Sequence, residues 1–420
     1  MRNDIPEKTI TIPNFTVNIT PVKELVDSEQ LQEGRYKKQV GLVERVYPGA
    51  NHTRFEHPLG VYYTVKEDYA KSLKLDPELV LLLSIAALFH DVGHGPFSHQ
   101  VEPLVIGEDH ESRGLKIVHE FKTEIGKRVD FDRFVEIFSK KDPLSKIIYD
   151  RNLGADKLDY LFRDDLHMGI GNWSYARNKR IIEYLIYDSD CGRLGIDEKM
   201  EHDVMALQNH YVYMHAGGYL RKKSVIDQRM FQRSIEEMLK ANPELDLMGL
   251  NDVSLINELI NSENKLAKNL YQRLISRRGD SLKAAVVLKI EGYGERINGK
   301  DMHLVALPEE QMNKFNKKYE NVRKVSILED EVADELGINQ GELLIATMQF
   351  ADRILPKDVW LFSKNKGWHS LFKKKPYHEE TLQNQYKDSF AIRVITTEDK
   401  RRYVSERTEE ITDIILDKIN

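Results

Sequence analysis

An apolar helix runs directly into a cluster of histidines, and this junction constrains the fold more than any other stretch. Residues 79–89 read LVLLLSIAALF and residues 90–99 read HDVGHGPFSH. The apolar run is far too short to span a bilayer and predicts a buried helix instead. The glycines and the proline of the second stretch end that helix directly after His90 and Asp91. Adjacent side chains diverge by about 100° on a regular helix, so this pair can act together only at a helix end.

Histidines are concentrated in this part of the chain. Six of the 14 histidines fall between residues 52 and 110, where an even distribution would place about two. Imidazole is a common ligand of zinc, iron and manganese, and carboxylates join it at hydrolytic sites. A single histidine at a helix end is usually only a hydrogen-bonded polar residue. His90-Asp91 followed by His94 and His99 favours a metal site.

Two further stretches can complete such a site. ANHTRFEHPLG, at residues 50–60, precedes an apolar helix, and GADKLDYLFRDD, at residues 154–165, has carboxylates and a phenol at near-helical intervals. One helix face can therefore carry them together. A solvated charged face is the alternative interpretation of the second stretch. The candidate residues are His52, Arg54, Glu56, His57, Asp156, Lys157, Tyr160 and Asp164, with Asp159 as an alternative to Tyr160.

Composition indicates an ordinary globular protein. The 420 residues are 41% hydrophobic and 31% charged, and the net charge of -6 gives no general attraction to nucleic acid. Cys191 is the only cysteine, which excludes an internal disulfide and a Cys-rich zinc site. The N-terminus has no secretory-signal pattern. We expect a cytoplasmic protein without a membrane segment.

The pattern of hydrophobic residues predicts a mainly α protein with a smaller α+β lobe. Residues 8–20 suggest a short strand or hairpin, and residues 183–196 suggest a hairpin that turns between Asp188 and Gly192. Most of the remaining first half has helical spacing. Beyond residues 241–247 a helix near 253–277 precedes several β-rich runs. We therefore predict a metal-binding helical core at 1–245 and an α+β lobe at 246–420.

These motifs together resemble the HD-domain phosphohydrolases, whose signature is a histidine, a His-Asp pair and a distant aspartate. They are closer still to the deoxynucleoside triphosphate (dNTP) triphosphohydrolases, a group with bacterial and vertebrate members. The resemblance covers about residues 25–280. It rests on RYKKQVGLVERVYPGANHTRFEHPLGV (35–61), AALFHDVGHGPFSH (86–99), the His110-Glu111 pair and DKLDYLFRD (156–164).

The resemblance implies a metal-dependent hydrolase. Its metal ligands would be His57, His90, Asp91 and Asp156, and the divalent ion would be iron, manganese, zinc or magnesium. A positioned water would attack the α-phosphorus of a dNTP and release a deoxynucleoside and inorganic triphosphate. Such a site needs open coordination positions for water or a phosphate oxygen.

The resemblance also implies a proton-transfer group. The 5′ alkoxide of the sugar is a poor leaving group, so a general acid is needed. The family pattern assigns that role to His99, with Glu102 and His110 arranging its proton. Here a glutamate stands where the vertebrate enzymes have an aspartate. His94 and Arg54 would contact the phosphates near the reacting centre.

Substrate contacts follow from the same resemblance. Arg54, Lys157 and Tyr160 would meet the triphosphate, where cationic groups are needed. Gln39 and Asp164 would bind the 3′ hydroxyl of the sugar, and the Tyr160 ring would exclude a 2′ hydroxyl. His215 and Tyr219 would line the base and sugar pocket. We expect a homo-oligomer.

The sequence departs from the vertebrate pattern at two positions. Glu33 stands where those enzymes have an arginine that serves a second, activating nucleotide site. A carboxylate repels a triphosphate, so we predict that activation of that form is absent. Leu220 follows Tyr219 where the vertebrate enzymes have glutamine, which predicts a different base selectivity.

Two alternatives remain from the sequence. The same four ligands could serve an HD-type phosphodiesterase or nuclease that acts on another phosphate ester. The chain could also be a nucleic-acid-binding or regulatory protein with an inactive metal site. Residues 360–377, WLFSKNKGWHSLFKKKPY, interleave aromatic side chains and lysines, a composition suited to single-stranded nucleic acid. An exposed loop or an oligomer interface would have the same composition.

Overall fold

The computed structural model describes residues 7–105, 107, 109–276, 281–293, 301–348 and 355–419. The chain divides into two compact units. The first comprises Met1–Glu102, Gly107–Met214 and Pro356–Glu380, and the second comprises Pro103–Ile106, His215–Leu355 and Thr381–Asn420. That separate domains meet near residue 245 stays a prediction.

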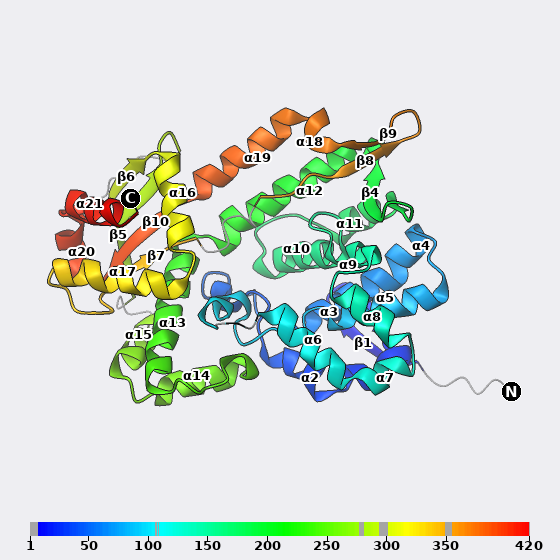
Figure 1. The fold of residues 1–420 in the computed structure, drawn as a ribbon, viewed down its shortest axis with the longest axis horizontal. Helices are drawn as coiled ribbons and strands as arrows, with labels where there is room; N and C mark the ends of the chain where they lie inside the picture. Colours follow the sequence, from blue (N-terminus) through cyan, green and yellow to red (C-terminus); the bar gives the residue numbers. More distant parts are fainter. Residues whose placement is uncertain are drawn as a thin grey trace. The chain divides into compact units, whose positions relative to one another are not determined.

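The first unit is mainly helical, as predicted (Figure 1). A π-helical segment, Thr64–Tyr69, joins α3 to α4. Its helices are α1 (Lys23–Val26), α2 (Glu29–Gln32), α3 (Glu56–Tyr63), α4 (Ala70–Ser72), α5 (Pro77–Phe89), α6 (His110–Glu120), α7 (Lys122–Gly126), α8 (Phe131–Phe138), α9 (Lys146–Tyr149), α10 (Ala155–Met168), α11 (Tyr175–Ile182), α12 (Glu201–Met214) and α18 (Leu371–Lys374). Its strands are β1 (Thr9–Ile12), β2 (Phe15–Asn18), β3 (Leu185–Asp188), β4 (Arg193–Asp197), β8 (Trp360–Ser363) and β9 (Gly367–Ser370).

The second unit combines helices with a sheet and confirms the predicted α+β character. The strands of this sheet occur in the order β6-β5-β10-β7, with β5 and β6 parallel and β10 antiparallel to both of its neighbours. The strands are β5 (Lys283–Ile290), β6 (His303–Leu307), β7 (Leu343–Ala346) and β10 (Ile392–Thr396). The helices are α13 (Lys222–Ala241), α14 (Asp252–Asn261), α15 (Lys265–Ile275), α16 (Glu309–Lys318), α17 (Val322–Glu335), α20 (Glu398–Ser405) and α21 (Thr408–Ile419); α19 (Pro376–Ser389) begins in the first unit and ends in the second.

The apolar helix predicted before His90 is α5. The carboxylate of Asp76 accepts a hydrogen bond from the backbone N–H of Leu79 at 2.9 Å, and Pro77 begins the helix, which is the expected N-cap and N1 pair. The C-terminal half of α5 is buried, and His90 caps its end. The core therefore holds the position at which the metal-ligand motif begins.

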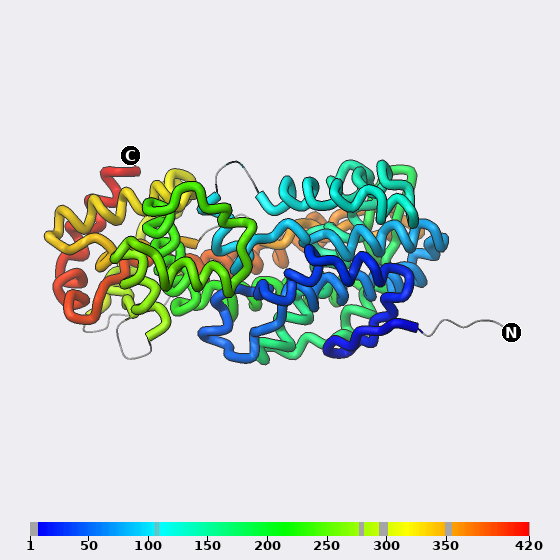
Figure 2. Tube along the Cα trace, turned by 90° about the horizontal axis from the view of Figure 1, so that it is seen from below, coloured from blue at the N-terminus to red at the C-terminus, as the bar shows by residue number. Residues whose placement is uncertain are grey.

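Both predicted hairpins are present in the first unit. Thr9 pairs with Asn18 in the β1-β2 hairpin, which is dark blue in Figure 2 and packs on α3. Asp188 pairs with Arg193 at the turn of the β3-β4 hairpin, where Gly192 adopts a left-handed φ of 57°. The β8-β9 hairpin, orange in Figure 1, extends this sheet through a parallel pairing of β8 with β4.

The aromatic and lysine-rich segment, residues 360–377, forms this β8-β9 hairpin, α18 and the first residues of α19. Trp368 donates its indole N–H to Asp188 at 2.8 Å, and the Arg193 guanidinium lies 4.2 Å from the centre of the Trp360 ring. Lys374 forms ion pairs with Glu198 and Glu201. These side chains thus take part in packing and pairing within the first unit, and single-stranded nucleic-acid binding stays a prediction.

Across the described residues, no helix is long and apolar enough to cross a membrane.

Replacing Phe89 tests the packing that holds the end of α5. Its ring is fully buried and meets the rings of Phe121 and Phe134 edge-on. We expect Phe89→Ala to lower the free energy of unfolding of the first unit by about 3–5 kcal/mol, the usual cost of removing a buried aromatic ring. Leu166→Ala, at a side chain that is 45% exposed, is the control, with an expected change below about 0.5 kcal/mol. Urea unfolding followed by circular dichroism measures both, and equal effects would contradict the prediction.

Candidate active site

Three helices of the first unit bring the predicted metal ligands together. His57 lies in the first turn of α3, His90 caps α5, and Asp156 lies in the first turn of α10. α3 packs against both other helices (Figure 1). The Nε2 atom of His57 lies 3.1 Å from Oδ1 of Asp156 and 3.2 Å from Nε2 of His90.

The other nitrogen of each imidazole is tied to an acceptor. Nδ1 of His90 donates to the backbone carbonyl of Ala87 at 2.7 Å, and Nδ1 of His57 donates to Oδ2 of Asp159 at 2.7 Å. Each Nδ1 thus keeps its proton, and both Nε2 atoms point toward the same space, where a proton or a metal cation can lie between them. Two imidazole nitrogens and a carboxylate oxygen form a donor set that would fit a divalent metal.

Asp91 is the fourth predicted ligand and joins this group. Its Oδ2 lies 3.4 Å from Nε2 of His90 and 3.8 Å from Nε2 of His57, and it accepts a hydrogen bond from Nη1 of Arg54 at 2.5 Å. Burial alone would raise the pKa of Asp91, but His90, Arg54 and His94 hold it well below its ordinary value. The carboxylate is therefore charged and able to bind a cation.

The pKa of His57 reflects its anionic surroundings. Burial lowers this pKa, but hydrogen bonds to Asp156 and Asp159 outweigh that effect and raise it to about 10. A site that attracts a proton this strongly also attracts a metal ion, which competes for the same nitrogen.

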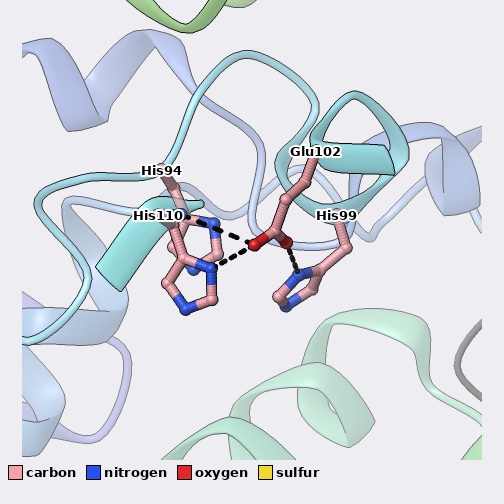
Figure 3. Close-up of side chains that lie close together, drawn as sticks. All are labelled: His94, His99, Glu102 and His110. Carbon is pink, nitrogen blue, oxygen red and sulfur yellow. Dashed lines mark hydrogen bonds and ion pairs between the residues drawn. The ribbon is translucent and has the colours of Figure 1, made fainter. Parts of the chain in front are cut away.

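A second cluster contains the predicted proton-transfer residues His99, Glu102 and His110 together with His94, which was predicted to contact the phosphates (Figure 3). One carboxylate oxygen of Glu102 accepts from Nδ1 of His99 at 3.0 Å, and the other accepts from Nδ1 of His110 at 2.6 Å. Burial would raise the pKa of Glu102, but these two histidines hold it well below its ordinary value. The longer arm of glutamate thus reaches both rings.

His94 connects the two clusters. Its Nε2 lies 3.4 Å from Oδ1 of Asp91, and its ring stacks on that of His110 at 4.0 Å. Burial, Arg54 and His110 keep its pKa well below the ordinary value. His94 is therefore a neutral ring beside the metal ligands.

The turn that carries His99 contains backbone strain. Phe97 and Ser98 have left-handed φ angles of 51° and 56°, which non-glycine residues rarely adopt. The buried Phe97 side chain and two hydrogen bonds of the Ser98 hydroxyl, to the backbone carbonyl of Lys38 and from Nε of Arg54, both at 2.7 Å, hold the turn. This turn orients His99 toward Glu102.

The predicted phosphate contacts lie beside the metal ligands. Lys157 follows the ligand Asp156, donates to the Tyr160 hydroxyl, and lies 3.8 Å from the centre of the Tyr211 ring. Burial lowers the pKa of Lys157 to about 7, although Asp156 and Asp150 oppose this change. An anionic ligand would favour its charged form.

The predicted sugar contacts are separated between the two units. Oε1 of Gln39 is buried and has no partner among the described residues, and Asp164 is buried on α10. Both lie in the first unit. His215 and Tyr219 belong to a π-helical segment of the second unit, with ring centres 4.9 Å apart. Their part in a base pocket stays a prediction.

A cavity of about 350 Å³ opens beside the metal ligands, a volume within the usual range for ligand sites. Lys140 lies on its wall and pairs with Glu111 at 2.5 Å. The other lining residues include His90, Asp91, His110, Tyr149 and Asp156.

Three supporting residues lacked an assigned role in the sequence analysis. Asp159 holds His57, Arg163 binds both carboxylate oxygens of Asp159 at 2.9 and 2.8 Å, and Glu56 accepts from Arg163 at 2.7 Å. The i,i+4 spacing of Asp159 and Arg163 was a visible signal. The choice between Asp159 and Tyr160 required the tertiary structure.

Comparisons with known proteins agree with this geometry. Residues 54–164 match the HD domain family. The chain is 33% identical over 267 residues to an uncharacterized protein of Methanocaldococcus jannaschii, a match that covers 60% of this chain and 56% of that protein. It is 26% identical over 326 residues to the deoxynucleoside triphosphate triphosphohydrolase SAMHD1 of Danio rerio, with 62% and 49% covered. The chain thus spans about half the length of these curated relatives.

A solved structure, that of a phosphohydrolase from Bacteroides thetaiotaomicron, has the same fold. The TM-score is 0.68 at 21% identity, over 93% of this chain and 99% of that one. Residues 54–164 thus match the HD domain family, and the fold is shared with a solved phosphohydrolase. The resemblance to dNTP triphosphohydrolases is confirmed at the level of sequence similarity.

Removing one ligand at a time tests the metal site. We expect His90→Ala and Asp156→Ala to reduce the affinity for metal by much more than about 100-fold, so that the variants lose their bound metal. Replacing a residue that only orients a ligand typically reduces the affinity by about 10- to 100-fold. His202→Ala, at an exposed side chain of α12, should retain it. Elemental analysis after dialysis against iron, manganese, zinc or magnesium measures the content. Variants that retain the wild-type content would contradict the site.

Proposed function

We propose that this chain is a metal-dependent dNTP triphosphohydrolase, which cleaves a dNTP to a deoxynucleoside and inorganic triphosphate. The observation that carries the proposal is the junction of the two clusters through His94. Metal ligands lie on one side of it and a carboxylate-bridged histidine pair on the other. Hydrolysis of a poor leaving group needs a site for the attacking water and a proton donor for the alkoxide.

His57, His90, Asp91 and Asp156 would hold the metal. When bound, a divalent ion at this site activates water and neutralises phosphate charge. Arg54 and Lys157 supply additional positive charge close to the ligands. In the family pattern, these two side chains meet the phosphates.

His99 is the proposed acid. Glu102 accepts from its Nδ1, and 51% of the side chain is exposed, so a substrate can reach the ring. Although the side chain is open on one side, the protein around it and Arg54 lower the pKa of His99, and Glu102 opposes this change. A protonated imidazole with a lowered pKa donates its proton more readily to a developing alkoxide.

The reaction products decide between this function and other phosphate-ester chemistry. Metal-loaded protein is incubated with each dNTP, alone, in mixtures and with GTP, and the products are separated by ion-exchange chromatography. We expect inorganic triphosphate and deoxynucleoside in equal amounts, without a requirement for GTP because Glu33 stands at the activating position. Nucleoside monophosphate as the product would indicate an HD-type phosphodiesterase. The absence of triphosphate with every metal and mixture would overturn the proposal.

Glu102→Gln tests the proton-transfer cluster. Glutamine has an NH2 group in place of one of the two oxygens, and this group cannot accept from the Nδ1 atom of His99 or of His110 that faces it. We expect dNTP hydrolysis to slow by about 100-fold, the lower range for loss of general acid catalysis, while metal content is unchanged. Glu120→Gln, exposed at the end of α6, is the matched control and should hydrolyse dNTPs at the wild-type rate. Unchanged hydrolysis by Glu102→Gln would contradict the role of this cluster.

A further inference from the structure

A buried histidine contacts both residues that are proposed to bind the sugar hydroxyl. Nε2 of His52 lies 2.7 Å from Oδ1 of Asp164, and each residue is 3% exposed. The backbone carbonyl of His52 accepts from the backbone N–H of Gln39 at 3.0 Å. One residue therefore holds Asp164 through its ring and Gln39 through its backbone.

The surroundings of His52 determine which of its two ring nitrogens carries the proton. Its Nδ1 is buried and has no partner among the described residues. An N–H at that position would lack an acceptor, which is more costly than an unused lone pair. The ring proton therefore sits on Nε2 and is donated to Asp164. That hydrogen bond occupies one carboxylate oxygen of Asp164 and sets the direction of the other.

A second histidine holds the His52 ring in its plane. His167 stacks on His52 with ring centres 4.3 Å apart and an interplanar angle of 10°. Nε2 of His167 contacts Oε1 of Glu56 at 2.8 Å. Burial would raise the pKa of Glu56, but His167 and Arg163 lower it, so this carboxylate is charged. The contact with Glu56 thereby fixes the His167 ring, on which His52 stacks.

The same residues extend to the metal ligand His57. Glu56 also accepts from Arg163, which binds Asp159, the acceptor for Nδ1 of His57. A Cβ atom at Gly60 would lie 2.1 Å from Nη2 of Arg163 and 2.2 Å from Oδ1 of Asp159. α3 therefore needs a glycine where this buried ion pair packs against it. The sugar carboxylate and the metal ligand are thus oriented by one continuous set of contacts.

We propose that His52 is a positioning residue for recognition of the 3′ hydroxyl, which it sets by orienting Asp164 and the Gln39 backbone. This inference rests on the proposed function and on the family resemblance, which implies that Asp164 and Gln39 meet the sugar of a dNTP. His52 does not touch the substrate. Its ring makes Asp164 a fixed acceptor, so that a sugar with a 3′ hydroxyl is favoured over a sugar without one.

The test compares each dNTP with its 2′,3′-dideoxy analogue. A site built around a hydroxyl rejects an analogue that lacks it, because buried polar groups are then unpaired. His52→Leu has a similar volume but no donor, and we expect it to lower kcat/KM for the dNTP by about tenfold while the value for the dideoxy analogue is nearly unchanged. His52→Gln retains an N–H donor and should recover most of the preference. Bound metal should stay at the wild-type content in both variants.

Controls separate positioning from a general structural role. His202→Leu, on the exposed face of α12, should leave kcat/KM unchanged for both substrates. In an Asp164→Ala background, His52→Leu should cause no further loss for the dNTP, because the two residues act through one contact. If His52→Leu does not fold by circular dichroism, His52→Phe, which keeps a ring against His167, replaces it.

The outcomes are distinguishable from those of the proposed function. Equal loss for both substrates, or a glutamine variant that behaves like the leucine variant, would overturn the role of His52 while leaving the hydrolase intact. A wild-type protein that forms triphosphate from no dNTP would overturn the proposed function and this inference with it. Selective loss for the dNTP with recovery in His52→Gln supports the inference.

Discussion

The close approach of His57 and His90 is the constraint on which the rest of the site depends. Their Nε2 atoms lie 3.2 Å apart, and each Nδ1 is already committed to an acceptor. Because hydrogen bonds to Asp156 and Asp159 raise the pKa of His57 to about 10, this position holds a proton when no other cation is bound. The surrounding helices hold the arrangement, because burying the apolar faces of α3, α5 and α10 brings these side chains together.

A chain of buried ion pairs balances the charge around His57 and His90. Asp159 is fully buried only because Arg163 binds both of its oxygens, and Arg163 in turn binds Glu56. Removing one member would leave an uncompensated charge in the interior. Such a network orients its members more than it stabilises the fold, since apolar residues of similar volume would pack there without the cost of burying charges. Its position between the metal ligand and the His52-His167 stack agrees with an orienting purpose.

In the second cluster, a strained turn and the length of the glutamate side chain together place one carboxylate against two histidines. Two left-handed residues before His99 turn the chain so that Glu102 faces its ring, and the extra methylene of glutamate reaches His110 as well. The same sequence with aspartate would require a closer backbone. The departure from the vertebrate pattern is therefore compatible with the contact that the pattern implies.

Local features of the sequence determined much of this protein. The end of α5, the Asp76 cap and the two hairpins depend on residues close in the chain, and the prediction of four metal ligands depends on a highly specific motif. Other features depend on contacts between distant segments and could not be read from local patterns. These include the pairing of Asp159 with His57, the stacking of His52 on His167 across 115 positions of the chain, and the return of residues 356–380 to the first unit. Only the packing of α3 on α10, and of β8 on β4, decided them, because long-range contacts form where apolar faces fit together.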